Sequence, residues 1–549
     1  MKKLLMLGTL LLSTAGANSL SANLPAGAVA TLETQNFSPT YARVMQVLED
    51  LLGNLPEPLS DVASTLEELG PLLNNSFNNE ATVGLFTVGD AKTGFDLHYL
   101  IAVRTKGDAK KLFIEDGLMG VPKATARIGQ YGLARDGDSF SGQQGDLLYT
   151  SDNKALLMNY LGKLSGKAGP RLASSPAYSL ATRQAGTQEL SAFLNFSAAA
   201  KLVRGAFGKE IGLPRLLSPV VDAVDTLGQW RGGLSSTASG LKTSSAHTVN
   251  PEGKDASLRT LLTHTRDNFE IGRLIPADAS AVSVNACHSG TGAYLGRWLT
   301  RFDLLEPTGF LSDTQLAAEL EMQSRYLGDE CAQITARGVQ PSKTTSAGLL
   351  SSLVSTVSIQ SVTDEALARR QMDGLTRSVN AALRSSLTQV YGLANGFGDS
   401  GSEQETAIFA PLLSMLDPKQ LDEVSMRHAF KDGYLITAFS QAALDQVLNA
   451  PETLQDNAQF NALKGNAGVT WSPKPSEAFT AESLLEKIQT QLSGNPAAGL
   501  LADPEMQEMA GPALDAFAGV LNRYGGAWSR TNVTGNSRIT QGEVQFDWN

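Results

Sequence analysis

The sequence predicts an α+β protein made of two related domains, each a mainly antiparallel sheet covered by helices. Three observations support this fold class: short β-type runs separated by hairpin turns, amphipathic helical stretches between them, and an internal similarity between the two halves. Strands joined by hairpins pair antiparallel, and helices then cover one face of the sheet. A chain of 549 residues is also long for a single core, which favours two or more domains.

The N-terminus has the pattern of a secretory signal. Lys2 and Lys3 precede an apolar run over 4–12, and small residues follow up to Ala17. The run is about half of the roughly 20 residues needed to cross a bilayer. We therefore expect residues 1–17 to be removed, with cleavage after Ala22 as the alternative. The mature chain has no candidate transmembrane segment, and we expect it in the periplasm or cell envelope of a bacterium.

An internal repeat is the main signal of domain organisation. Segments of the first half match segments of the second in the same order: 24–30 with 275–281, 102–109 with 359–366, 145–148 with 433–436, 192–197 with 467–472, and 230–233 with 523–526. One match would be chance, but an unchanged order favours duplication. The predicted domains are 18–270 and 271–549, and the second carries a helical insertion around 308–351.

Hydrophobic period predicts the elements within each half. In the first, runs over 82–88 and 95–103 form a hairpin, and 131–135 leads into a turn at Asp136-Gly137. In the second, 426–430 and 434–439 flank the equivalent turn at Asp432-Gly433. Three stretches have a helical period: 38–52, which begins at Ser38-Pro39, then 108–114 and 363–391. Covering a sheet is the favoured role of these helices over binding a partner or a membrane surface.

The two cysteines, Cys287 and Cys331, predict a disulfide in an oxidising compartment. Closing the loop between them would stabilise the fold by roughly 3 to 4 kcal/mol in the chain-entropy model. The alternative is a metal site built from Cys287 and His288. Adjacent residues on a strand point to opposite faces, so this pair would chelate a metal poorly.

The charge pattern excludes nucleic acid as a partner. The formal net charge is −11, and no run of Lys or Arg forms a basic face that would release counterions from a phosphate backbone. An acidic surface is typical of an exported protein that stays soluble.

Two segments resemble serine hydrolase motifs. Gly398-Asp399-Ser400-Gly401 is similar to the nucleophile loop of trypsin-like proteases, but it stands in a Gly- and Ser-rich linker. Gly137-Asp138-Ser139 is similar to the nucleophile region of certain esterases, but it forms a hairpin turn. The downstream Asp-x-x-His pair of those esterases is absent among His98, His247, His264, His288 and His428. We therefore predict no catalytic residues. A hydrolase would require Ser139 or Ser400 to meet a histidine and a carboxylate in space.

Metal and cofactor motifs are also missing. The sequence has no His-x-x-x-His, no Cys-x-x-Cys, no calcium loop and no Gly-rich phosphate loop, so we predict no metal ligands and no cofactor. Asp136, Asp138 and Asp146 are the weak candidates for a surface ion, although Phe140 occupies a position where an oxygen ligand would be needed.

Several aromatic residues are candidates either for the core or for a pocket that binds an apolar or sugar ligand. Core packing is favoured, because alternate strand positions of this kind usually pack against helices. These residues are Phe193, Phe196, Trp230, Trp471, Tyr524 and Trp528.

The opening Leu24-Pro25-Ala26-Gly27-Ala28 after a signal, with a repeated strand, helix, strand layout, resembles the exported bacterial proteins of domain of unknown function 3352. The second opening departs from the motif at Asp278. The resemblance implies no known reaction, so it supplies no site residues. We predict a cell-envelope protein that acts by binding or structural contact with an unknown envelope protein or apolar ligand. The alternatives are a periplasmic carrier of a lipid or other apolar ligand, and a hydrolase hidden in the loops.

Overall fold

The computed structural model describes residues 19–35, 43, 80–90, 94–104, 123–185, 188–206, 214, 217–302, 313–339, 354–396, 424–476, 478–485 and 504–548. The helices expected over 38–52, apart from residue 43, and over 108–114, together with Ser400 and Ala17, lie outside these residues.

The first half contributes one run of antiparallel strands. In space the order is β5-β6-β7-β3-β2-β1-β8-β9-β10, with the short β4 paired to β5. The strands are β1 (Ala28–Thr34), β2 (Ala81–Asp90), β3 (Gly94–Arg104), β4 (Ala126–Ile128), β5 (Tyr131–Asp136), β6 (Ser139–Gln144), β7 (Leu147–Ser151), β8 (Leu190–Asn195), β9 (Gln229–Thr237) and β10 (Gly240–Thr248).

The second half contributes a run with the same pattern of neighbours. Its order is β14-β15-β13-β12-β11-β16-β17-β18. Here β11 lies between β12 and β16 as β1 lies between β2 and β8. The strands are β11 (Ala281–Ala286), β12 (Leu327–Thr335), β13 (Thr356–Val362), β14 (Arg427–Lys431), β15 (Tyr434–Ala438), β16 (Gly468–Pro473), β17 (Tyr524–Thr534) and β18 (Ser537–Phe546).

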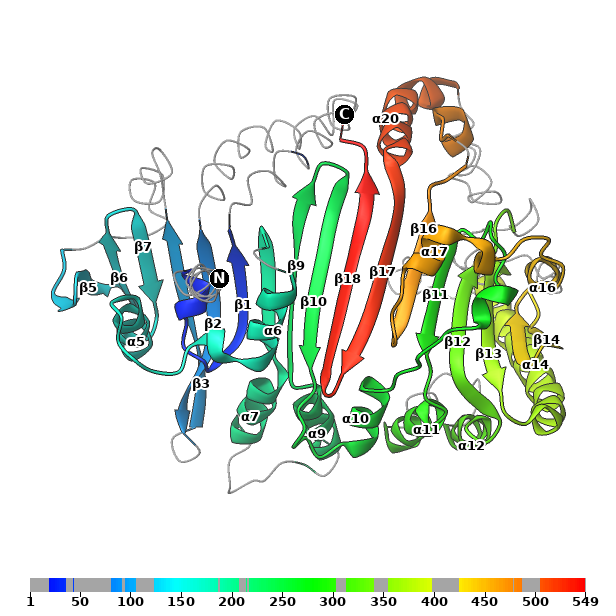
Figure 1. Cartoon of the computed structure of the whole chain (residues 1–549), viewed down its shortest axis with the longest axis horizontal. Helices are drawn as coiled ribbons and strands as arrows, with labels where there is room; N and C mark the ends of the chain where they lie inside the picture. The colour runs from blue at the N-terminus through cyan, green and yellow to red at the C-terminus, as the bar shows by residue number, and fades with distance from the viewer. Residues whose placement is uncertain are drawn as a thin grey trace, which may run out of the picture.

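The two runs join into one 18-stranded sheet, which differs from the separate sheets that the sequence predicted. The join is the antiparallel pair of β10 and β18, in register from Gly240 opposite Gln545 to Thr248 opposite Ser537 (Figure 1). Each of these strands would otherwise be an edge with unpaired N–H and C=O groups. Their pairing satisfies both edges at once and makes the mixed α+β fold continuous.

Helices cover the sheet and also line one end of its strands. Figure 1 shows α7, α9, α10, α11 and α12 in a row along the lower end, with α5 and α6 against the first half and α16 and α17 against the second. The helices are α5 (Lys154–Leu164), α6 (Pro176–Ala185), α7 (Phe196–Ala206), α9 (Ser218–Leu227), α10 (Ala256–Leu262), α11 (Thr291–Phe302), α12 (Asp313–Gln323), α14 (Glu365–Gly396), α16 (Gln441–Leu448), α17 (Ala458–Ala462) and α20 (Pro504–Asn522).

Each half has its own core on the same face of the sheet. The first packs Leu24, Leu100 and Phe193 against α5, and the second packs Ile275 and Ile359 against α16. Short 3₁₀ turns, η1 (Ser21–Asn23) and η3 (Ile271–Leu274), lead into these cores at corresponding places. Both cores therefore begin with the segment that precedes the first strand of their half.

Several local predictions are confirmed. The hairpins β2–β3, β5–β6 and β14–β15 form where the sequence placed them, and α14 begins at Glu365 within the expected helix. Gly137 has φ +57 and Asp432 has φ +50, the left-handed conformations that such tight turns require. A disulfide joins Cys287 to Cys331, as predicted, with 5.8 Å between the Cα atoms. The range 308–351 contains α12 and also the strand β12.

Candidate functional site

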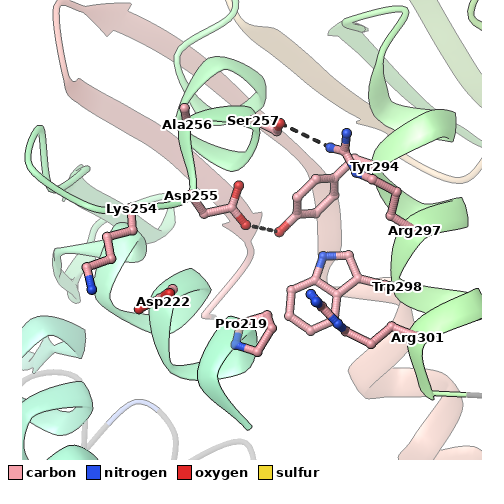
Figure 2. A pocket seen from close by; sticks show the side chains of 10 residues that line it. All are labelled: Pro219, Asp222, Lys254, Asp255, Ala256, Ser257, Tyr294, Arg297, Trp298 and Arg301. Carbon is pink, nitrogen blue, oxygen red and sulfur yellow. Dashed lines mark hydrogen bonds between the residues drawn. The ribbon is translucent and has the colours of Figure 1, made fainter. Parts of the chain in front are cut away.

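A pocket of about 450 Å³, here called the junction pocket, lies where helices of the two halves meet (Figure 2). It lies among α9 and α10 of the first half and α11 of the second. Its volume is within the range of about 300–1,000 Å³ that is usual for small-molecule sites. It is lined by Pro219, Asp222, Lys254, Asp255, Ala256, Ser257, Tyr294, Arg297, Trp298 and Arg301.

The sequence around α9 fixes the first wall of the pocket. Pro219 stands in the first turn of the helix, where a residue without an N–H is tolerated. Gly228 ends the helix at φ +72, and a Cβ at this position would lie 2.2 Å from the carbonyl oxygen of Thr248. A side chain at position 228 would collide with β10, so glycine is required where the chain turns from α9 into β9. This turn fixes the position of α9, and with it Asp222, at the pocket.

The second wall is the start of α10, which is fixed by Asp255. Its Oδ1 accepts the backbone N–H of Leu258 at 2.9 Å, a typical helix N-cap. Its Oδ2 accepts the hydroxyl of Tyr294, on α11, at 2.8 Å (Figure 2). Arg297 adds a second contact between the halves by donating to the hydroxyl of Ser257 at 3.0 Å.

Tyr294 and Trp298 form a fixed aromatic wall. Burial and the neighbouring Asp255 carboxylate raise the pKa of Tyr294 to about 12, so its phenol stays protonated and donates to Asp255. The ring of Trp298 packs edge to face against Tyr294 with 6.1 Å between centroids, and it stacks on Phe302 with 5.4 Å between centroids. The positions of both rings are therefore set before any ligand arrives.

The charges that line the pocket are unbalanced. Asp222 shares Arg204 with Asp225: the guanidinium lies 2.8 Å from the Asp222 carboxylate and 3.2 Å from that of Asp225. Asp255 is occupied by the helix cap and by Tyr294. Within the described part of the chain, the three cations Lys254, Arg297 and Arg301 form no ion pair. The exposed head groups of these cations leave a local positive charge in a protein of net charge −11.

The hydrolase candidates do not converge among the described residues. Ser139 bonds the phenol of Tyr99 at 2.7 Å rather than a histidine. His98 pairs with Asp152 at 3.1 Å, but it neighbours Tyr99 on the same strand and therefore points to the opposite face of the sheet. The hydrolase hypothesis required Ser139 to lie close to both a histidine and a carboxylate. Among the described residues it does not.

The surface-ion hypothesis also fails in the described residues, where no group of three or more His, Cys, Asp or Glu is placed to hold a metal. Asp146 pairs with Arg104 at 3.3 Å, and Asp138 lies 4.0 Å from Arg135. Because Cys287 is in the disulfide, it offers no thiolate to a metal beside His288.

The aromatic residues singled out in the sequence lie elsewhere: Phe193 is fully buried in the first core, and Trp471 lies opposite Trp528 on neighbouring strands. None of the six lines the junction pocket. The residues that do were missed because they come from three separated elements. One local signal existed: Arg297, Trp298 and Arg301 are spaced to share one side of a helix.

Comparison with known proteins adds little. No protein-family model matches the chain, and no curated protein matches it. The resemblance to domain of unknown function 3352 stays a prediction. Three solved structures of TP0453 align with this chain at a TM-score of 0.23. Crystal forms III and I are 10% identical and cover 46% of this chain, and the alignment covers 89% and 88% of their own chains. Crystal form IV is 9% identical, and its alignment covers 42% of this chain and 81% of its own. A likeness this weak carries no conclusion about function.

In the part of the chain that the structure describes, no helix combines the length and the hydropathy that crossing a bilayer requires.

Proposed function

We propose that the protein is a non-catalytic binding protein of the bacterial cell envelope that holds an anionic ligand in the junction pocket. The observation that carries this proposal is the set of three cations at one pocket that form no ion pair with any residue the structure describes. Arginine binds carboxylates and phosphates through two parallel hydrogen bonds, and lysine adds a point charge. An anion in the pocket would neutralise side chains that otherwise repel one another.

The disulfide supports the envelope location. Cys287 and Cys331 join neighbouring strands, and such bonds persist in oxidising compartments but are rare in the cytosol. Export through a cleaved signal is part of the proposal.

We also infer that the two halves arose by duplication. Supporting contacts recur at corresponding positions. The N–H of Leu172 donates to Leu24 at 2.8 Å, and the N–H of Leu454 donates to Ile275 at 2.9 Å. The matched openings also make the same isolated bridge, Pro25 with residue 171 and Pro276 with residue 453. Superposing the halves of an experimental structure tests this inference, because duplicated halves will align with the matched segments in register.

Calorimetric titration of the mature protein with inorganic phosphate and with lactate tests the anion site. The double variant Lys254→Gln, Arg301→Gln is expected to lower affinity for both anions by about tenfold, the effect of losing about 1.4 kcal/mol of binding energy. The double variant Lys242→Gln, Arg337→Gln is the matched control, because it also removes two exposed positive charges but outside the pocket. Absence of binding to both anions, or an equal loss in the control, would overturn the proposal.

An apolar ligand is the second candidate, and an exposed patch on the sheet favours it. Leu32 on β1 is 51% exposed, and it lies opposite Val83 on β2, which is 38% exposed. Leu97 on β3 is also 51% exposed. On the same face of the second half, the register brings together Ser283, Gln333, Ser358 and Thr470. Exposed apolar residues on this face of the sheet are thus a feature of the first half and not of the whole face. Exposed apolar patches of this kind mark interaction sites.

Native mass spectrometry of the protein purified from its own envelope separates the two candidates. A bound acid lost from the Lys254→Gln, Arg301→Gln variant would support the junction pocket. A bound lipid lost from a Leu32→Ser, Leu97→Ser variant, but retained by the pocket variant, would support the carrier instead.

A further inference from the structure

The junction pocket combines its cations with a flat aromatic surface, which a site for a simple anion does not need. Trp298 and Arg301 both line the pocket, and Figure 2 shows the indole next to the Tyr294 ring. The edge-to-face contact with Tyr294 and the stack on Phe302 hold this ring in place. A preordered ring loses little entropy when a ligand packs on it.

Carboxylate oxygens stand near the aromatic wall. Asp222 accepts from Arg204 through Oδ1, and a carboxylate has about four lone-pair sites, so it retains capacity for ligand hydroxyl groups. Asp255 and Ser257 add further oxygens at the start of α10. The pocket therefore offers cations, hydroxyl acceptors and an aromatic face together, and its apolar lining is Trp298, Tyr294, Pro219 and Ala256.

We propose that the junction pocket binds a sugar ring that carries an acidic group, a carboxylate or a phosphate. This inference rests on the proposed anion-binding function. The C–H face of the ring packs on the Trp298 indole, the acidic group lies against Arg301 and Lys254, and ring hydroxyls donate to Asp222. The volume of about 450 Å³ suits a ligand of this size.

Titration calorimetry with four probes tests the inference. The acidic sugars N-acetylmuramic acid and N-acetylglucosamine 6-phosphate are compared with the neutral sugar N-acetylglucosamine and with ringless lactate. At least one acidic sugar is expected to bind about tenfold or more tightly than both the neutral sugar and lactate. The better of the two acidic sugars identifies the acidic group as carboxylate or phosphate.

Two variants at Trp298 make the test specific for the ring. Trp298→Leu is expected to weaken binding of the preferred acidic sugar by about tenfold, because the sugar ring packs on a flat surface that leucine lacks. The affinity for lactate is expected to stay unchanged. Trp298→Phe keeps a flat ring and is expected to restore most of the affinity. Thermal unfolding midpoints of both variants establish that the fold is intact.

The outcomes separate the two proposals. Equal binding of lactate and both acidic sugars, or an acidic-sugar affinity unaffected by Trp298→Leu in a folded protein, overturns the sugar ligand and leaves the anion site standing. A neutral sugar that binds as tightly as the acidic sugars also overturns it. Failure of every anion to bind overturns the proposed function itself.

Discussion

A glutamate in each half, fully buried in the second and partly buried in the first, fastens the segment that leads into the first strand. Glu330 is fully buried, and its carboxylate accepts the backbone N–H of Ile271 at 2.7 Å and the hydroxyl of Tyr434 at 2.7 Å. Arg266 lies 3.2 Å from the same carboxylate. In the first half, Glu80 accepts the backbone N–H of Leu20 in the same way. Folding removes the Ile271 and Leu20 N–H groups from water, and in each case a glutamate carboxylate accepts the hydrogen bond in place of a backbone carbonyl.

Glu330→Gln is expected to lower the free energy of unfolding by about 1–3 kcal/mol, because an amide has one acceptor oxygen and cannot accept both the Ile271 N–H and the Tyr434 hydroxyl, while Arg266 keeps only Asp329 as its partner. The shift of the urea unfolding midpoint measures this loss. Glu365→Gln is the matched control: Glu365 pairs with Arg369 one helical turn away on the exposed surface, and losing that pair costs about 0.3–0.5 kcal/mol. Equal shifts for the two variants would show that Glu330 is not a structural anchor.

Residue-level signals decided which parts of the molecule were predictable. The turns at Gly137 and Asp432 follow from two-residue patterns, and the disulfide follows from the only two cysteines of the chain. Glu330 gave no such signal, because a charged residue within a strand reads as a solvated position until its partners Ile271 and Tyr434 are known. The cations of the junction pocket were missed for the same reason.

At the scale of elements, η1 (Ser21–Asn23) is part of the first core although it directly follows the expected signal. Leu20 and Leu24 are fully buried, Ser21 bonds the phenol of Tyr178 at 2.9 Å, and Tyr160 donates to the carbonyl oxygen of Leu20 at 3.3 Å. Loss of the Leu20 side chain alone would remove about 2–3 kcal/mol of burial. The two cleavage positions considered in the sequence therefore have different consequences for the fold.

The mature protein is expected to begin at Asn18, after cleavage at Ala17, because cleavage after Ala22 would remove Leu20 and its bond to Glu80. Intact-mass measurement of the protein isolated from its own envelope identifies the first residue directly. A chain produced from Asn23 is expected to unfold at lower urea concentration than one produced from Asn18. A native species that starts at Asn23 with undiminished stability would contradict this prediction.

At the scale of the whole molecule, the join of the halves was beyond sequence reasoning. The pair of β10 and β18 brings together residues about 300 positions apart, such as Ser245 and Thr540. The sequence of neither strand indicates which strand it pairs with. The segments matched between the two halves could be found because that search compares one stretch of sequence with another. The pairing of β10 with β18 depends instead on the unpaired N–H and C=O groups that each half would leave along its edge strand. Those edges exist only once each half of the sheet has formed.

Because β18 lies between β10 and β17, both halves are expected to lose stability together when it is broken. Thr540→Pro removes a backbone N–H from a central strand, where every N–H has a neighbour, and is expected to cost about 1–3 kcal/mol. Thr540→Val is the control, since it removes only the hydroxyl that bonds Thr531. Hydrogen exchange is expected to increase in the proline variant at both β8 and β16. Increased exchange in one half alone would mean that the halves fold as independent domains that merely touch along this pair.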